Sequence, residues 1–251
     1  MSPSRASCYT PAAMWLFITV QEKEDYYTNG PGGRIKARLE LASGERCLVV
    51  PYQEIDLRAV RELAPRAIAF GGFGGRFQDR DAAWFRGMDE VFHGADVPML
   101  CFCGSHQVLG HSFSRDLSRA KRLRDQPMRR LSESDEAPRR ARQSPTVDLS
   151  GWYVADGFVP ITRVRDDPLF AGLPRRMIMR CAHYAEVKRL PPDFVLLASS
   201  GHCLIEAMRH RTRPLYGTQF HPEAYEEPWR HGRRLLENFA AIARRHREEA
   251  S

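Results

Sequence analysis

The stretch PMLCFCGSHQVLG, residues 98–110, decides the fold. It begins with an apolar run and changes at Cys103 to Gly, Ser, His and Gln. An apolar run of this kind is typical of a strand that is buried on both faces of a sheet. The residues from Gly104 onward can start a helix. Cys103 therefore occupies a sharp turn from strand to helix, a nucleophile elbow that exposes a reactive side chain at the end of the sheet.

The two cysteines of this stretch have different predicted roles. Cys101 lies within the apolar strand, where a thiol packs as a small hydrophobic group. Cys103 follows the strand, and its sulfur is expected near the N-terminus of a helix, which favours the thiolate. A metal site is the weaker interpretation, because Cys-x-Cys supplies two ligands and no second pair stands at a ligand spacing. We expect no metal.

Other apolar runs predict further strands. They are bounded by glycine, proline or charged residues and cover residues 13–20, 46–52, 66–72, 97–102, 194–200 and 214–220. Residues 56–65 and 81–95 have apolar side chains at helical spacing, and so has the C-terminal segment 233–249. The alternation of strand and helix predicts an α/β fold in three layers, with a mostly parallel central sheet and helices on both faces.

A second stretch, LYGTQFHPE at residues 215–223, supplies partners for a reactive thiol. His221 can take and return the proton, and Glu223 can hold the imidazole. A His-Pro-Glu sequence by itself is more often a surface turn. Because it follows a predicted strand in a chain that also has a cysteine elbow, we interpret Cys103, His221 and Glu223 as a catalytic triad.

Composition limits the remaining possibilities. The 251 residues are 43% hydrophobic and 27% charged, as in ordinary globular proteins, and we expect one domain over residues 1–251. Six cysteines without a compact framework of spacings indicate free thiols and a cytoplasmic location. No apolar segment reaches the length of a membrane span.

The net charge of +7 raises the question of nucleic acid. Much of the excess lies within about residues 114–150, a segment rich in Arg, Ser and Pro and poor in aromatic residues. This composition predicts a solvated, dispensable excursion rather than an RNA-binding arm. It could still dock an acidic partner protein.

The two quoted stretches together resemble the class I, triad-type glutamine amidotransferases, which have a flavodoxin-like fold. That family has Gly-x-Cys-x-Gly-x-Gln at the elbow and Gln-Phe-His-Pro-Glu near the end. The resemblance implies that FGGFGG, residues 70–75, is the loop that donates a backbone amide to the oxyanion, with Gly72 and Gly104 as donors. It further implies that substrate is bound by Gln107 and by the segment CAHYAEV, residues 181–187, through Ala182 and His183.

Four positions depart from the family pattern. Cys101 and Ser105 stand where the elbow has glycine, Phe73 where the loop has proline, and Ala182 where the family has serine. None of these departures removes a member of the triad.

The resemblance implies that the chain hydrolyses the side-chain amide of glutamine without a cofactor and supplies ammonia to a separate synthase or ligase. A free-standing hydrolase of γ-glutamyl amides is the alternative. A noncatalytic interaction protein that uses the basic segment is a third possibility.

Overall fold

The computed structural model of the chain describes residues 14–30, 33–115, 117, 119–135 and 148–249. Its centre is a nine-stranded sheet with the order β2-β1-β3-β4-β9-β8-β7-β5-β6. The first five strands in this order are parallel to one another: β1 (Met14–Thr19), β2 (Arg46–Pro51), β3 (Ala67–Phe70), β4 (Met99–Phe102) and β9 (Leu215–Thr218). Four antiparallel strands extend the sheet beyond β9: β5 (Ala155–Arg163), β6 (Arg176–His183), β7 (Phe194–Ser199) and β8 (Ala207–His210).

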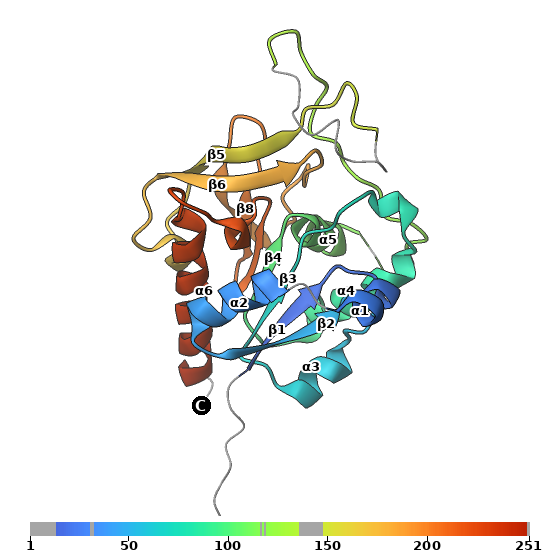
Figure 1. Ribbon diagram of the computed structural model, residues 1–251, viewed down its shortest axis with the longest axis vertical. Helices are drawn as coiled ribbons and strands as arrows, with labels where there is room; N and C mark the ends of the chain where they lie inside the picture. Colours follow the sequence, from blue (N-terminus) through green and yellow to red (C-terminus); the bar gives the residue numbers. More distant parts are fainter. Residues whose placement is uncertain (1–13, 31–32, 116, 118, 136–147, 250–251) are drawn as a thin grey trace, which may run out of the picture.

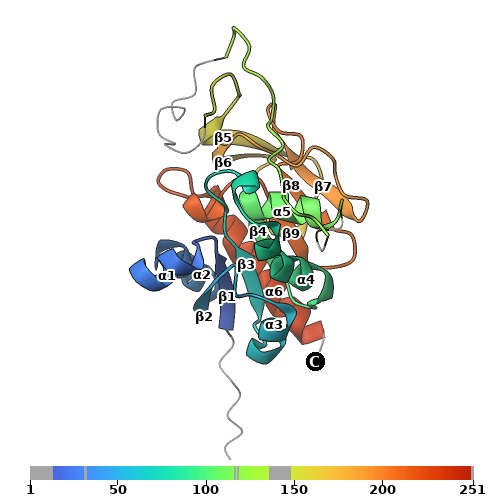
Figure 2. The same ribbon diagram turned by 90° about the vertical axis from the view of Figure 1, so that its right-hand side faces the viewer.

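Helices cover both faces of the parallel strands (Figures 1 and 2). Alternate side chains of β1 show the division, because Trp15 and Phe17 join one core while Leu16 and Ile18 join the other. The first core is covered by α2 (Gly33–Ser43) and α6 (His231–Glu249). The second core is covered by α3 (Leu57–Leu63), α4 (Arg86–Gly94) and α5 (Gly104–Ser112). The predicted three-layer α/β architecture with a parallel centre is confirmed.

The six strands expected from the apolar runs are all present, with ends that differ by a few residues. Helix α3 begins after Asp56, whose carboxylate accepts a 2.7 Å hydrogen bond from the N–H of Ala59. The helix expected at residues 81–95 differs at its start, because residues Ala82–Phe85 form a 3₁₀ turn before α4.

Five elements were not expected from the sequence: β5, β6, β8, α2 and α1 (Lys23–Asn29). Strands β5 and β6 form an antiparallel pair that runs across the top of Figure 1. Buried and exposed residues alternate along β6, so it lacks the continuous apolar run of the central strands. Helix α2 buries only Leu39 and Ser43, which leaves a weak helical pattern.

The basic segment differs from its expected solvated form where the structure describes it. Leu123 and Met128 are buried, and the carboxylate of Asp125 accepts hydrogen bonds from the Phe77 N–H and the Tyr184 hydroxyl. The prediction that the whole segment is dispensable is therefore wrong for residues 119–135, because a few apolar side chains and one buried acid attach it to the domain. Residues 136–147 lie outside the described part of the chain.

No helix in the described ranges is long and apolar enough to cross a membrane.

Substituting Phe239 by alanine should destabilise the fold by about 3–5 kcal/mol. Its ring is fully buried on α6, at 5.5 Å from the ring centre of Trp15 and 6.1 Å from that of Tyr216. Urea unfolding measures the loss. Leu41→Ala is the matched control on α2, because Leu41 is 63% exposed, and should change the free energy of unfolding by no more than about 0.5 kcal/mol. Equal losses in the two variants would contradict this assignment of the core.

Candidate functional site

Cys103 lies at the end of β4, with φ 47° and ψ −106°. This conformation is unusual for a residue that has a Cβ, and it is held on both sides. The Cys103 N–H donates a 2.7 Å hydrogen bond to the carbonyl of Thr218 at the end of β9, and its carbonyl accepts one of 3.1 Å from the Gln107 N–H. Helix α5 begins at the next residue. The predicted elbow is therefore present, with the sulfur near the N-terminus of a nine-residue helix.

His221 and Glu223 lie in the short turn that follows β9. The Nδ1 atom of His221 is 2.7 Å from Oε1 of Glu223, and Glu223 is only 4% exposed. The turn is attached to two other elements. The His221 N–H donates a 2.8 Å bond to the carbonyl of Arg180 on β6, and the Arg38 guanidinium of α2 donates to the carbonyl of Glu223. The imidazole is thus oriented by a buried carboxylate on a fixed backbone.

The structure brings the histidine to the cysteine. A Cβ placed on Gly72 would lie 2.8 Å from Cε1 of His221 and 3.1 Å from Cβ of Cys103, so Gly72 fills the space beside both side chains. Burial lowers the pKa of His221, but the charge of Glu223 and the adjacent Cys103 outweigh it, and together they hold the pKa well above its usual range. At neutral pH His221 is therefore an imidazolium, which stabilises a thiolate beside it.

The loop between β3 and residue 75 closes over the elbow. A Cβ on Gly104 would lie 2.5 Å from the backbone nitrogen of Phe73, so no side chain fits at Gly104 while the loop is in place. The Phe73 ring is packed at 5.1 Å from that of Tyr52 and 5.3 Å from that of Phe85. The two predicted oxyanion residues, Gly72 and Gly104, therefore both lie next to Cys103.

Two buried glutamines connect the cysteine to the start of the 181–187 segment. Gln107 donates a 2.9 Å bond to the carbonyl of Ala185 and lies 3.3 Å from the side-chain oxygen of Gln219. The Gln219 amide in turn lies 3.7 Å from the sulfur of Cys103. Gln219 was not among the predicted site residues. Its position at the start of the Gln-Phe-His-Pro-Glu sequence was the available signal.

Ala182 and His183 end strand β6 on the same side of the site. Burial and then the nearby His221 lower the pKa of His183 to about 3, so its ring is neutral. Its Nε2 atom has no hydrogen-bond partner in the described part of the chain. Ala182 and His183 thus lie where the sequence predicts a substrate contact.

Three ligand-type side chains meet beside this strand end. The ligand atoms of Cys181, His183 and Glu206 lie within 4.8 Å of one another, and all three residues are buried. Burial raises the pKa of the Cys181 thiol well above its ordinary value and that of Glu206 to about 7. The group could hold a metal ion, so the expectation that the chain has no metal stays a prediction.

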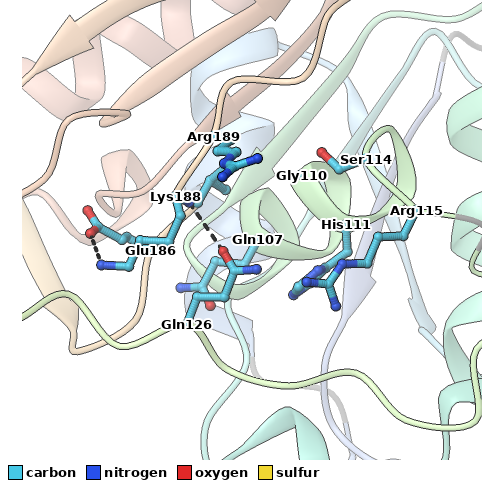
Figure 3. Close-up of a pocket in the computed structure, with 10 residues that line it drawn as sticks. Gln107, Gly110, His111, Ser114, Arg115, Gln126, Glu186, Lys188 and Arg189 are labelled. Carbon is cyan, nitrogen blue, oxygen red and sulfur yellow. Dashed lines mark hydrogen bonds and ion pairs between the residues drawn. The ribbon is translucent and has the colours of Figure 1, made fainter.

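A pocket of about 300 Å³ lies along the outer side of Gln107 (Figure 3). Its lining is rich in charge and includes Arg115, Lys188 and Arg189, with Glu186 paired to Lys188 at 2.5 Å. Cys103 is not among the residues that line it. The pocket adjoins the triad through Gln107 rather than containing it.

The family model "Glutamine amidotransferase class-I" matches residues 37–243. Two curated relatives are similar over part of the chain, and both are named as the glutamine-hydrolyzing subunit of GMP synthase. The protein of Archaeoglobus fulgidus is 34% identical over 150 residues, which are 60% of this chain and 64% of the relative. That of Pyrococcus furiosus is 33% identical over 154 residues, which are 61% of this chain and 64% of the relative. The chain thus spans slightly less than two thirds of the length of these relatives.

Two solved structures share the fold. A Thermoplasma acidophilum protein described as a GMP synthase subunit has a TM-score of 0.69 at 21% identity, and the match covers 96% of this chain and 99% of that one. A glutamine amidotransferase from Thermotoga maritima has a TM-score of 0.56 at 13% identity, with 95% and 85% covered. At these identities the likeness concerns the fold alone.

Replacing Glu223 by glutamine should lower the pKa of His221, because the amide removes the negative charge that favours the imidazolium. The stabilisation from the charged pair is fully present below about pH 6.5 and is lost as the pH rises through the raised pKa of His221. In the variant this loss should begin at a lower pH. An NMR titration of the His221 ring measures the shift.

The matched control is Glu237→Gln, which removes a carboxylate that is paired with Arg233 on the outer side of α6. It should leave the titration of His221 unchanged. An unaltered pKa in Glu223→Gln would show that this carboxylate does not set the charge of the imidazole.

Proposed function

Because the chain belongs to the class I glutamine amidotransferase family, we propose that it hydrolyses the side-chain amide of glutamine and delivers the ammonia to a separate acceptor enzyme. The observation that carries this proposal is the elbow cysteine beside a buried His–Glu pair. Cys103, His221 and Glu223 come from two distant parts of the sequence, and neighbouring parallel strands bring them together. This is the arrangement that acyl transfer to a thiol requires.

The Cys103 thiolate attacks the amide carbon, and the carbonyl oxygen takes up negative charge. His221, already an imidazolium, gives its proton to the leaving nitrogen, which departs as ammonia when the tetrahedral adduct collapses to a thioester. The neutral imidazole then takes a proton from water, whose oxygen attacks the thioester. Collapse of the second adduct releases glutamate and returns the thiolate and the imidazolium. Glu223 stays ionised and keeps the imidazole in place.

The negative oxygen of both adducts needs donors that are already in position. The backbone N–H groups of Gly72 and Gly104 are our candidates, since both residues lie against Cys103. The absence of side chains at these two positions leaves room for the amide of the substrate.

Gln107, Ala182 and His183 are our candidates for binding the amino-acid end of the substrate. The Gln107 amide is held between Ala185 and Gln219, which sets its direction. Ala182 and His183 lie at the edge of β6, where backbone groups can reach a ligand. The steps need no cofactor or metal.

The acceptor enzyme is proposed from the relatives. Their names describe the glutamine-hydrolysing part of a GMP synthase, which supports a separate synthetase as the protein that receives ammonia. The described cysteines are all free, namely Cys47, Cys101, Cys103, Cys181 and Cys203. This agrees with a cytoplasmic location.

One observation favours a second candidate, the hydrolysis of γ-glutamyl amides larger than glutamine. The pocket beside Gln107 has room for a substituent, and Arg115, Lys188 and Arg189 would suit an anionic one. In that case the same triad would act on a substituted amide without an acceptor protein.

Cys103→Ala should lower glutamine hydrolysis by about 10⁴-fold or more, because the nucleophile is lost. Cys101→Ala should keep activity within a few-fold of the wild type. Cys101 is fully buried in the core, and burial raises the pKa of its thiol well above its ordinary value. Glutamate release from glutamine or from a γ-glutamyl anilide measures both variants. An active Cys103→Ala variant would rule out the thioester mechanism.

The acceptor hypothesis predicts slow hydrolysis by the chain alone and a rise when its synthetase is added. A free amidotransferase without this restraint would lose ammonia to solvent. Steady-state kinetics with and without the synthetase encoded next to it test this. A kcat/KM of about 10⁴ M⁻¹s⁻¹ or more for the chain alone, with no gain from the synthetase, would favour the γ-glutamyl hydrolase instead.

A further inference from the structure

Ser105 connects the elbow helix to the glycine loop. It lies in the first turn of α5, two residues after Cys103, and is completely buried. Its hydroxyl donates a hydrogen bond to the carbonyl oxygen of Gly71, which lies 34 residues earlier in the sequence. This position has glycine in the family pattern, and a glycine has no hydroxyl to make such a bond. The contact is therefore a property of this chain's own sequence.

The Gly71 carbonyl belongs to the same peptide group as the N–H of Gly72. A trans peptide is planar, so its C=O and N–H point in opposite directions. Fixing the carbonyl of Gly71 against Ser105 therefore fixes the direction of the Gly72 N–H on the other side of the plane. Within the described residues, that N–H donates to no protein acceptor.

The parts of the loop on either side of this peptide are held by other contacts. The Gly71 N–H donates a 3.0 Å bond to the carbonyl of Ile18 on β1. On the other side, the Phe73 ring is packed against those of Tyr52 and Phe85. Between these two anchors, two glycines can rotate their shared peptide at low steric cost. The Ser105 hydroxyl restrains that rotation.

We infer that Ser105 is a positioning residue: it orients the Gly71–Gly72 peptide so that the Gly72 N–H is preset to receive the oxyanion. This inference rests on the proposed function, because that function needs a donor at Gly72. Ser105 itself touches neither the substrate nor the reacting atoms. It acts through the backbone of the loop, as donors arranged before the reaction do in acyl transfer.

The test compares Ser105→Ala and Ser105→Gly with Ser112→Ala. Ser112 is a buried serine at the other end of the same helix, and its hydroxyl bonds to Asp89 on α4 instead of the loop. Both Ser105 variants should lower kcat for glutamine about 10- to 100-fold with little change in KM, which is less than the loss from deleting an oxyanion donor. Ser112→Ala should keep kcat within about 2-fold.

A second measurement separates oxyanion stabilisation from general damage to the elbow. Alkylation of Cys103 by iodoacetamide needs the thiolate but forms no oxyanion, so its rate should be the same in Ser105→Ala and the wild type. Glutamate γ-semialdehyde, which forms a charged adduct with the thiol, should bind Ser105→Ala more weakly, again about 10- to 100-fold. Unchanged kcat in Ser105→Ala, or equal losses of alkylation and hydrolysis, would overturn the inference.

A third measurement does not depend on activity. The carbonyl ¹³C resonance of Gly71 should move in Ser105→Ala and stay in place in Ser112→Ala. An unmoved resonance would show that the hydroxyl does not hold this peptide. If wild-type protein with an alkylatable Cys103 hydrolysed neither glutamine nor γ-glutamyl anilides, the proposed function would fail, and the Gly71 resonance would still decide whether Ser105 holds the loop.

Discussion

The site depends on the parallel pairing of β4 with β9. In this register Cys101 lies beside Gly217 and Phe102 beside Thr218, so the two strands end at the same level. The hydrogen bond from Cys103 to Thr218 continues the pairing one residue beyond β4. A slip of one residue would turn the side chains of a strand to the opposite face. The nucleophile and the His–Glu turn therefore meet because of strand register, although 118 residues separate Cys103 from His221 in the sequence.

How much of the molecule could be predicted depended on burial. Strands covered on both faces have continuous apolar sequences, and all six predicted strands are present. Strand β6, which alternates between buried and exposed residues, and helix α2, which buries little, gave weaker patterns and were missed. The basic segment shows a further limit of composition. Its charges predict solvation, but the positions of Leu123, Asp125 and Met128 decide how residues 119–135 are attached.

The candidate site was predictable where motif and strand end coincide. Cys103, His221 and Glu223 were identified because each follows an apolar strand, and the structure brings them together. Gln219 was passed over, although it lies between Cys103 and Gln107. The departures at Phe73 and Ser105 could not be interpreted from sequence, because their neighbours are distant in the chain. In the structure, Phe73 lies over Gly104 while Ser105 bonds to Gly71, so the unusual residues of loop and elbow fit one another.

The backbone of Cys103 has a consequence for how this sequence can change over evolutionary time. A φ of 47° combined with a ψ of −106° suits glycine better than any residue with a side chain, at a cost on the order of 1–3 kcal/mol. The fold by itself would therefore gain from a glycine at position 103. A gene copy released from selection for chemistry would drift toward that exchange without losing its structure. Retention of cysteine at a position that opposes it is thus a record of selection for the thiol.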